Sequence, residues 1–155
     1  MQRLRLSEIQ QELRQNCTDR DAFVTSVVID SREVVPGSLF VALEGNKTDG
    51  ARFVSEALEK GAAACVLKRG KAPKKVPKEK LIEVEDPKKA LGVLGRLVRK
   101  RLNCRIIAVT GSVGKTTTKE LLSCLLSVRY CVSKAPKSFN NQIGVPLTLF
   151  STPSD

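Results

Sequence analysis

Residues 110–118 have the types and the spacing that bind the phosphates of a nucleotide. The stretch reads TGSVGKTTT, between an apolar run at 105–109, which predicts a short buried strand, and a helical pattern at 117–128. Glycines let successive backbone N–H groups point toward one centre, and the N-terminus of the following helix adds partial positive charge. We therefore expect a phosphate-binding loop made by Thr110, Gly111, Ser112, Val113, Gly114, Lys115, Thr116 and Thr117.

Within this loop, Lys115 and Thr116 are the candidate catalytic residues. The Lys115 ammonium supplies a mobile positive charge for the outer phosphates, and the Thr116 hydroxyl is suited to ligate a magnesium ion shared with them. ATP and Mg²⁺ are therefore the expected cofactors. The general pattern G-x-x-x-x-G-K-[ST] has glycine where this chain has Val109, so the loop is a variant. The alternative is an ordinary strand-to-helix turn that carries a surface lysine.

The residues before and after the loop alternate between strand and helix patterns, which is typical of an α/β fold with a parallel sheet. We predict strands at 23–29, 38–43, 62–67, 81–84 and 130–133, and helices at 7–14, 52–60, 87–101 and from 145 onward. Ser7 is the expected cap of the first helix, with Gln10 reaching back to it. Residues 1–103 are interpreted as a small N-terminal α/β domain. Residues 104–155 are interpreted as the start of a P-loop parallel-sheet domain, incomplete because such sheets usually have about five strands.

The chain carries a formal net charge of +11, much of it in a short run of basic residues. These residues are Lys68, Arg69, Lys71, Lys74, Lys75, Lys78 and Lys80. Such a charge raises the hypothesis of nucleic-acid binding, but the run contains prolines and no aromatic residue for base stacking. A solvated loop is the favoured interpretation, with no specific nucleic acid as partner.

The five cysteines show neither CxxC spacing nor a histidine to complete a zinc site, and they are expected to be small buried residues in a reducing cytoplasm. No apolar run approaches the roughly 20 residues that span a bilayer, so membrane insertion is not expected. A cytoplasmic location is the corresponding expectation, and the oligomeric state is left open.

Three stretches together resemble the Mur ligases, the ATP-dependent amide ligases that build the peptide stem of peptidoglycan precursors. The first is DSR at 30–32 with PGSLFVALEG at 36–45 and DG at 49–50; the second is the loop at 110–118. The third, FNNQIGVPLTL at 139–149, resembles the type that adds D-alanyl-D-alanine to UDP-N-acetylmuramoyl-tripeptide. Members of the family often have histidine at the position of Ala51 and asparagine at the position of Ser138, so the resemblance does not carry over the local substrate contacts at these two positions.

The resemblance implies an N-terminal domain that binds the UDP-muramoyl-peptide and a mechanism through an acyl phosphate. It assigns substrate binding to Ser31, Arg32, Asn140 and Asn141, with D-alanyl-D-alanine as the second substrate. From residue chemistry alone, Asp30 and Ser31 could instead shape a turn, and the asparagines could serve as cap and turn residues. Two other functions stay open: the ligase that adds the third stem residue, and a non-catalytic nucleotide-binding module. Because other active-site groups of the family follow the segment where this sequence ends, we expect no ligation by this chain alone.

Overall fold

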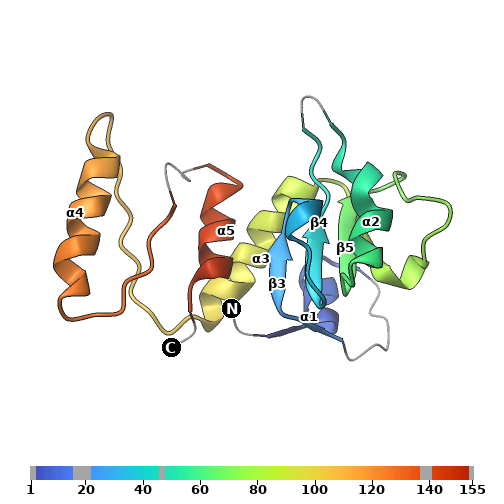
Figure 1. The fold of residues 1–155 in the computed structure, drawn as a ribbon, viewed down its shortest axis with the longest axis horizontal. Coiled ribbons are helices and arrows are strands. Elements are labelled where there is room, and N and C mark those ends of the chain that lie inside the picture. The colour runs from blue at the N-terminus through green and yellow to red at the C-terminus, as the bar shows by residue number, and fades with distance from the viewer. Residues whose placement is uncertain (1–2, 16–21, 46–47, 137–140, 154–155) are drawn as a thin grey trace.

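The computed structural model describes residues 3–15, 22–45, 48–136 and 141–153. A parallel sheet with strand order β3-β4-β5-β6 forms its centre, and a short antiparallel pair, β1 and β2, lies beside it (Figure 1). The strands are β1 (Leu4–Arg5), β2 (Phe23–Val24), β3 (Ser26–Val28), β4 (Ser38–Val41), β5 (Ala64–Lys68) and β6 (Leu81–Val84). The helices are α1 (Leu6–Glu12), α2 (Val54–Glu59), α3 (Pro87–Arg101), α4 (Lys115–Ser127) and α5 (Gly144–Ser151). The predicted α/β class with a parallel sheet is confirmed.

The central strand β4 is buried along its whole length because helices cover both faces of the sheet. Leu39 and Val41 face a core shared with α1, α3 and α5, whereas Phe40 faces a second core shared with α2. Successive residues of a strand point to opposite faces, so a strand covered on both sides is apolar without interruption. This explains why the run at 38–41 carries no polar position except Ser38, whose hydroxyl hydrogen bonds to that of Ser26 at 2.8 Å.

Helix α3 begins as the sequence predicts. Asp86 caps it, since one carboxylate oxygen accepts hydrogen bonds from the backbone N–H groups of Lys88 and Lys89 at 2.8 and 3.2 Å. Pro87 occupies the first turn, where no backbone donor is required. The buried face of the helix includes Leu91 and packs against the sheet. The cap therefore fixes where the helix starts at the carboxyl end of β6.

Helix α5 packs on α3, although about 40 residues separate them in the sequence numbering. Phe150 is 5% exposed and belongs to the core formed by β3, β4 and α3. A Cβ atom added at Gly95 of α3 would lie 3.1 Å from Pro146 Cβ, so the two helix surfaces touch at this point. Figure 1 shows α5 beside α3, with α4 at the far end of the molecule from the sheet. The division into residues 1–103 and 104–155 stays a prediction.

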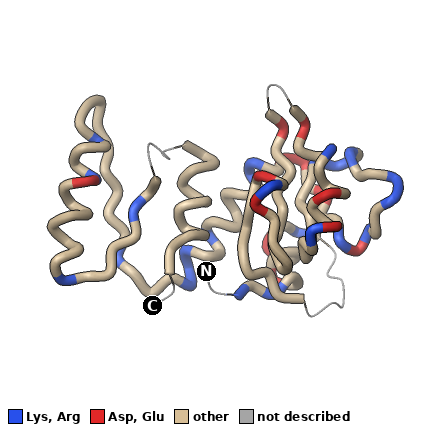
Figure 2. Tube along the Cα trace, viewed as in Figure 1, with Lys and Arg blue, Asp and Glu red and all other residues tan. Residues whose placement is uncertain are grey.

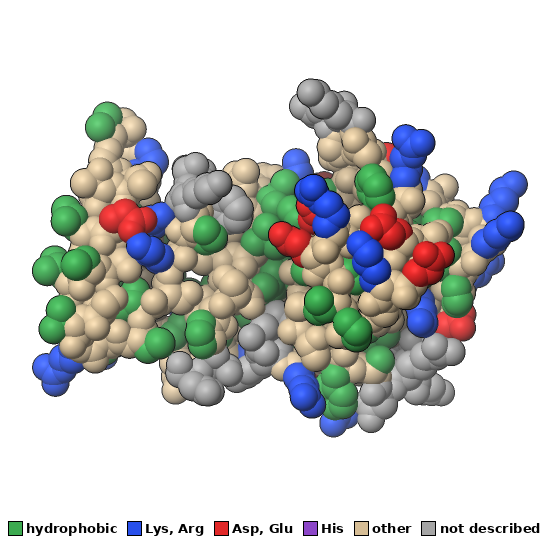
Figure 3. Space-filling model, in the orientation of Figure 1, with side chains coloured by type: hydrophobic (Ala, Val, Ile, Leu, Met, Phe, Trp, Pro, Cys, Tyr) green, Lys and Arg blue, Asp and Glu red, His purple; other side chains and the backbone are tan. Residues whose placement is uncertain are grey.

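Two predicted strands are wrong. Residues 105–109 and 130–133 have no strand structure, and the side chains of Ile106 and Ile107 are 50% and 59% exposed. A strand exists only when another strand hydrogen bonds to it, and no described segment lies beside either of these runs as such a partner. Large apolar side chains of α4 are also exposed, including Leu121 and Leu125, and Figure 3 shows hydrophobic atoms over this end of the molecule.

Two further expectations are corrected. Helix α1 begins at Leu6, with Glu8 accepting a hydrogen bond from the Arg5 N–H at 3.0 Å, so Ser7 lies inside the first turn and is not the cap. Of the cysteines, Cys65 is buried as expected. Three others, Cys104, Cys124 and Cys131, are exposed, because the segments that carry them have no packed layer over them among the described residues, and Cys17 lies outside those residues.

Candidate functional site

The predicted phosphate loop has the backbone conformation that its glycines allow. Gly111 and Gly114 have φ values of 144° and 81°, which strain any residue with a Cβ atom. Gly114 is the N-terminal cap of α4, and its carbonyl accepts the first helical hydrogen bond, from Thr118 N–H at 2.8 Å. Helix α4 therefore begins at Lys115, two residues earlier than predicted, and its positive end lies at the loop.

Lys115 extends over the loop and not away from it. Its Nζ donates to the carbonyl oxygens of Gly111 at 2.5 Å and of Ser112 at 3.4 Å. The ammonium group is thus held beside the backbone that a polyphosphate would contact. Thr116 follows on the first turn of α4 and is exposed, so its hydroxyl is accessible to a cation bound at the phosphates. The described residues contain no cluster of three or more His, Cys, Asp or Glu that would hold a metal without these phosphates.

Ser31 lies at a second location, the carboxyl end of β3. It is 7% exposed, and its Oγ donates to Glu56 Oε2 at 3.4 Å. Lys60 Nζ binds the same carboxylate at 2.7 Å and donates to the Ser31 carbonyl at 3.0 Å. Ligands of open parallel sheets bind beyond the carboxyl ends of the strands, and Ser31 is fixed at that edge by α2.

Arg32 forms an ion pair with its neighbour Asp30. The guanidinium Nε donates to the two carboxylate oxygens at 2.9 and 3.1 Å, and the Asp30 carboxylate also accepts from the Arg32 backbone N–H. The hydrogen bonds from Arg32 lower the pKa of Asp30 from 3.8 to about 2. The Arg32 side chain is 84% exposed. Its positive charge is therefore engaged by a carboxylate but is accessible at the same edge as Ser31.

Asn141 serves as a cap. Its Oδ1 accepts hydrogen bonds from the backbone N–H groups of Ile143 at 3.1 Å and Gly144 at 2.7 Å, at the start of α5. The structure thus shows the capping use that residue chemistry left open, and the same amide positions the loop in front of α5. Asn140, predicted as the second substrate-binding asparagine, lies outside the described residues.

A cluster of four charged residues, which sequence reasoning missed, lies at the same edge of the sheet. Glu44 and Asp49 follow β4; Lys68 ends β5, and Lys71 follows it. Lys71 Nζ is 2.5 Å from Glu44 Oε1 and 2.6 Å from Asp49 Oδ2, and Lys68 Nζ is 3.1 Å from Glu44 Oε2. The sequence did contain a signal for this cluster. Acidic residues follow one predicted strand and basic residues follow the next, and the carboxyl ends of neighbouring parallel strands lie at one edge of a sheet.

The comparisons with known proteins agree with this geometry. Residues 23–99 match the family described as "Mur ligase family, catalytic domain", and residues 109–155 match the Mur ligase middle domain. The chain belongs to the Mur ligase family. The two matches together include both locations described above, the edge that carries Ser31 and the whole phosphate loop at 110–117.

Similar Mur ligases are UDP-N-acetylmuramoyl-tripeptide--D-alanyl-D-alanine ligases. The Bacillus subtilis protein is 38% identical over 132 residues, which cover 85% of this chain and 29% of that protein. The Escherichia coli protein is 36% identical over 144 residues, which cover 93% of this chain and 31% of that protein. This chain thus spans about 30% of the length of these relatives.

Solved MurF structures share the fold. MurF from Acinetobacter baumannii superposes with a TM-score of 0.84 at 28% identity, over 99% of this chain and 34% of that one. MurF from Thermotoga maritima, in complex with ADP, gives a TM-score of 0.73 at 37% identity, over 83% of this chain and 30% of that one. The second structure shows that a relative with this fold binds a nucleotide.

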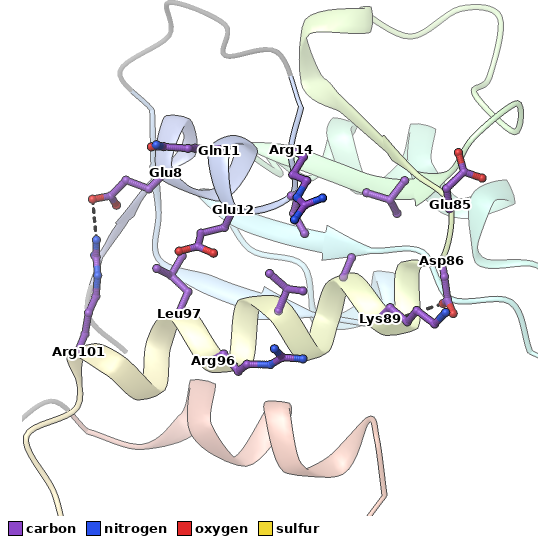
Figure 4. Close-up of a pocket in the computed structure, with 14 residues that line it drawn as sticks. Glu8, Gln11, Glu12, Arg14, Glu85, Asp86, Lys89, Arg96, Leu97 and Arg101 are labelled. Carbon is purple, nitrogen blue, oxygen red and sulfur yellow. Dashed lines mark hydrogen bonds and ion pairs between the residues drawn. The ribbon is translucent and has the colours of Figure 1, made fainter.

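This Mur ligase chain also has a groove between α1 and α3, away from the loop that begins α4. Its volume is about 840 Å³, and acidic and basic side chains line it, as Figure 4 shows. Glu8 and Arg101 form an ion pair across it at 2.6 Å. None of the described site residues predicted from the sequence lines this groove. The candidate site is therefore made by strand ends and a loop.

No described helix is long and apolar enough to cross a membrane.

Proposed function

We propose that this chain is the N-terminal portion of an ATP-dependent ligase that joins D-alanyl-D-alanine to UDP-N-acetylmuramoyl-tripeptide. The observation that carries the proposal is the match of most of the chain to ligases of that name. In this proposal residues 1–103 bind the UDP-muramoyl-peptide, and residues 104–155 begin the domain that binds ATP. The ion-paired Arg32 and the capped loop at Asn141 are compatible with these roles, since neither side chain is buried.

The reaction has two steps. The substrate carboxylate attacks the γ-phosphate of ATP, which forms an acyl phosphate and releases ADP. The amine of D-alanyl-D-alanine then displaces phosphate and forms the amide. Phosphoryl transfer of this kind depends on positioning and on neutralising charge, so the chain needs cations and backbone donors where negative charge accumulates.

Lys115 and the start of α4 supply those groups. The ammonium lies 2.5 Å from the Gly111 carbonyl and is thus already at the loop, where it would contact the outer phosphates. The N–H groups of the first turn of α4 would donate to the inner phosphates. Thr116 would hold Mg²⁺ through its hydroxyl, and the bound ion would neutralise charge on the transferred phosphoryl group.

Ser31 and Arg32 would bind the uridine nucleotide at the sheet edge. The Ser31 hydroxyl donates to Glu56 and the Ser31 carbonyl accepts from Lys60, so the residue is already fixed at this edge, and a phosphate oxygen would replace Glu56 as the acceptor of the hydroxyl proton. Arg32 would exchange part of its contact with Asp30 for a phosphate, because a guanidinium can donate to two acceptors at once. A D-alanyl-D-alanine contact is not assigned to any described residue.

A mass-spectrometric ligation assay tests the proposal. The chain is mixed with UDP-N-acetylmuramoyl-tripeptide, D-alanyl-D-alanine, ATP and Mg²⁺, alone and with a separately produced C-terminal portion of the Bacillus subtilis relative. We expect no product from the chain alone and product from the mixture. A mixture containing Lys115→Ala should lose the product. Equal product with Lys115→Ala would contradict the assignment of the loop. Product with the dipeptide substrate and a diamino acid would favour the ligase of the third stem residue.

A further inference from the structure

The exposed basic run at 68–80 divides into two kinds of lysine. Lys68 and Lys71 lie within ion-pair distance of carboxylates, whereas Lys74 and Lys75 are exposed and have no carboxylate partner among the described residues. Figure 2 shows the run as a basic loop that extends from the sheet at the end of the molecule opposite α4. The first two lysines are therefore part of a built cluster, and the others are ordinary solvated charges.

We propose that Lys71 is a positioning residue that neutralises an acidic rim at the nucleotide-binding edge, so that the diphosphate of the uridine nucleotide can approach it. The inference rests on the proposed function and adds to it a residue that the resemblance does not assign. It makes no use of the phosphate loop at 110–117.

The contacts of Lys71 join two loops. Its Nζ is 2.5 Å from Glu44 Oε1 and 2.6 Å from Asp49 Oδ2, so one ammonium bridges two carboxylates. Asp49 also accepts a hydrogen bond from the Ala51 N–H at 3.1 Å, and Glu44 pairs with Asp49 in a short antiparallel bridge. The two carboxylates are thus fixed close together by the backbone, and Lys71 offsets their mutual repulsion.

The cluster lies next to Ser31 because of the strand order. β3, β4 and β5 are consecutive parallel neighbours, and Ser31 and Glu44 each come three residues after the end of their strand. Neighbouring strands are about 4.8 Å apart, so the ends of β3 and β5 are about 10 Å apart. That distance is about one Debye length at 0.1 M salt, so salt weakens but does not remove the effect of the cluster's charge on a diphosphate bound at Ser31.

The charge count explains why Lys71 matters. Glu44 and Asp49 carry two negative charges, and Lys68 with Lys71 carries two positive ones. Hydrogen bonds from Lys71 lower the pKa of both carboxyls, which keeps them ionised above mildly acidic pH. Removing Lys71 would leave a net negative charge beside an already negative diphosphate. Binding of the nucleotide would then weaken by repulsion, without loss of any direct contact.

Calorimetric titration of the chain with UDP tests this inference. Lys71→Met should weaken UDP binding about tenfold at pH 7.5, the effect of one unit charge near a phosphate. Lys75→Met removes the same charge from the solvated part of the run and should change the affinity less than twofold. Lys71→Met combined with Glu44→Gln and Asp49→Asn should restore the affinity at least to within about threefold of the unmodified chain, because the only charge then left in the cluster is the positive one of Lys68.

Three results would overturn the account. Unchanged UDP binding by Lys71→Met would show that the lysine is a surface charge. A triple variant as weak as Lys71→Met would show that the lysine shapes the loop through its contacts and not through neutralisation. Lowering the pH to 4 gives an independent check, because carboxyls released from Lys71 regain their ordinary pKa values of 4.5 and 3.8 and take up protons there. Lys71→Met should then recover affinity relative to the unmodified chain, and no such recovery would contradict neutralisation. Failure of the unmodified chain to bind UDP would instead overturn the proposed function. Differences in affinity among the variants test only the role of Lys71.

Discussion

The contact between α3 and α5 predicts opposite effects for two glycines of the same helix. Gly95 faces Pro146, and an added Cβ atom would lie 3.1 Å from Pro146 Cβ and 3.2 Å from its Cα. Gly92, three residues earlier, has no atom within 4 Å of that position. Because the Cα of Pro146 belongs to the backbone, α5 must move to accommodate an alanine at Gly95.

The magnitudes follow from these distances. Replacing a helical glycine by alanine in open space stabilises a protein by about 0.5–1 kcal/mol, which is the expectation for Gly92→Ala. Gly95→Ala gains the same helix propensity but adds an overpacking cost of about 1–3 kcal/mol. The free energy of unfolding should therefore be about 1–3 kcal/mol lower for Gly95→Ala than for Gly92→Ala.

Urea denaturation of the two variants, followed by circular dichroism, measures this difference. The slope of the transition must be the same in both, so that the midpoints report stability. Equal stabilisation by the two alanines would refute the packing of α5 on α3 through Gly95. A lower free energy of unfolding in both variants would show that neither position tolerates a side chain, which would contradict the open space found at Gly92.

Three further predictions concern single groups. The ion pair with Arg32 lowers the pKa of Asp30 from 3.8 to about 2, so the pair stabilises the fold above about pH 4 and this stabilisation is lost as the pH falls toward 2. Arg32→Gln should raise the pKa of Asp30 toward 3.8, as followed by NMR titration of the carboxyl carbon. An unchanged pKa would contradict the pairing. Burial raises the pKa of the Cys65 thiol to about 12, so iodoacetamide at pH 8 should label the exposed Cys104 and leave Cys65 unmodified. Mass spectrometry of the labelled chain measures this difference. Equal labelling of the two cysteines would contradict the burial of Cys65. Asp86→Ala should lower the free energy of unfolding, measured by urea denaturation, by about 1 kcal/mol, because the cap of α3 is lost. Asp86→Asn should keep most of the stability of the unmodified chain, since an amide oxygen can also accept the two hydrogen bonds. Equal losses in the two variants would argue against the cap.

Local patterns predicted the elements whose causes are local. The cap at Asp86 and the apolar run of β4 appear where the sequence indicated, because each depends on a few adjacent residues. The loop at Gly114 was also predictable, since the glycines, the lysine and the following helix lie in one short stretch.

The failures concern interactions between distant residues. The apolar pattern at 105–109 cannot show whether another strand lies beside it, and in the described structure Ile106 is half exposed. The basic run suggested only solvation, because its composition does not show that Lys71 meets Glu44, 27 positions earlier in the numbering, across neighbouring strands. Likewise, the contact of Gly95 with Pro146 depends on how α5 returns to α3, which no local pattern encodes.

The most direct test of the central claim is the binding of ADP with Mg²⁺ to this chain, measured by calorimetry. The account predicts binding that Lys115→Ala weakens at least tenfold, about 1.4 kcal/mol, while Ser31→Ala leaves it unchanged because that residue lies at the separate uridine edge. UDP should show the reverse dependence on the two substitutions. ADP binding that is insensitive to Lys115→Ala would contradict the assignment of residues 110–117 as the phosphate loop.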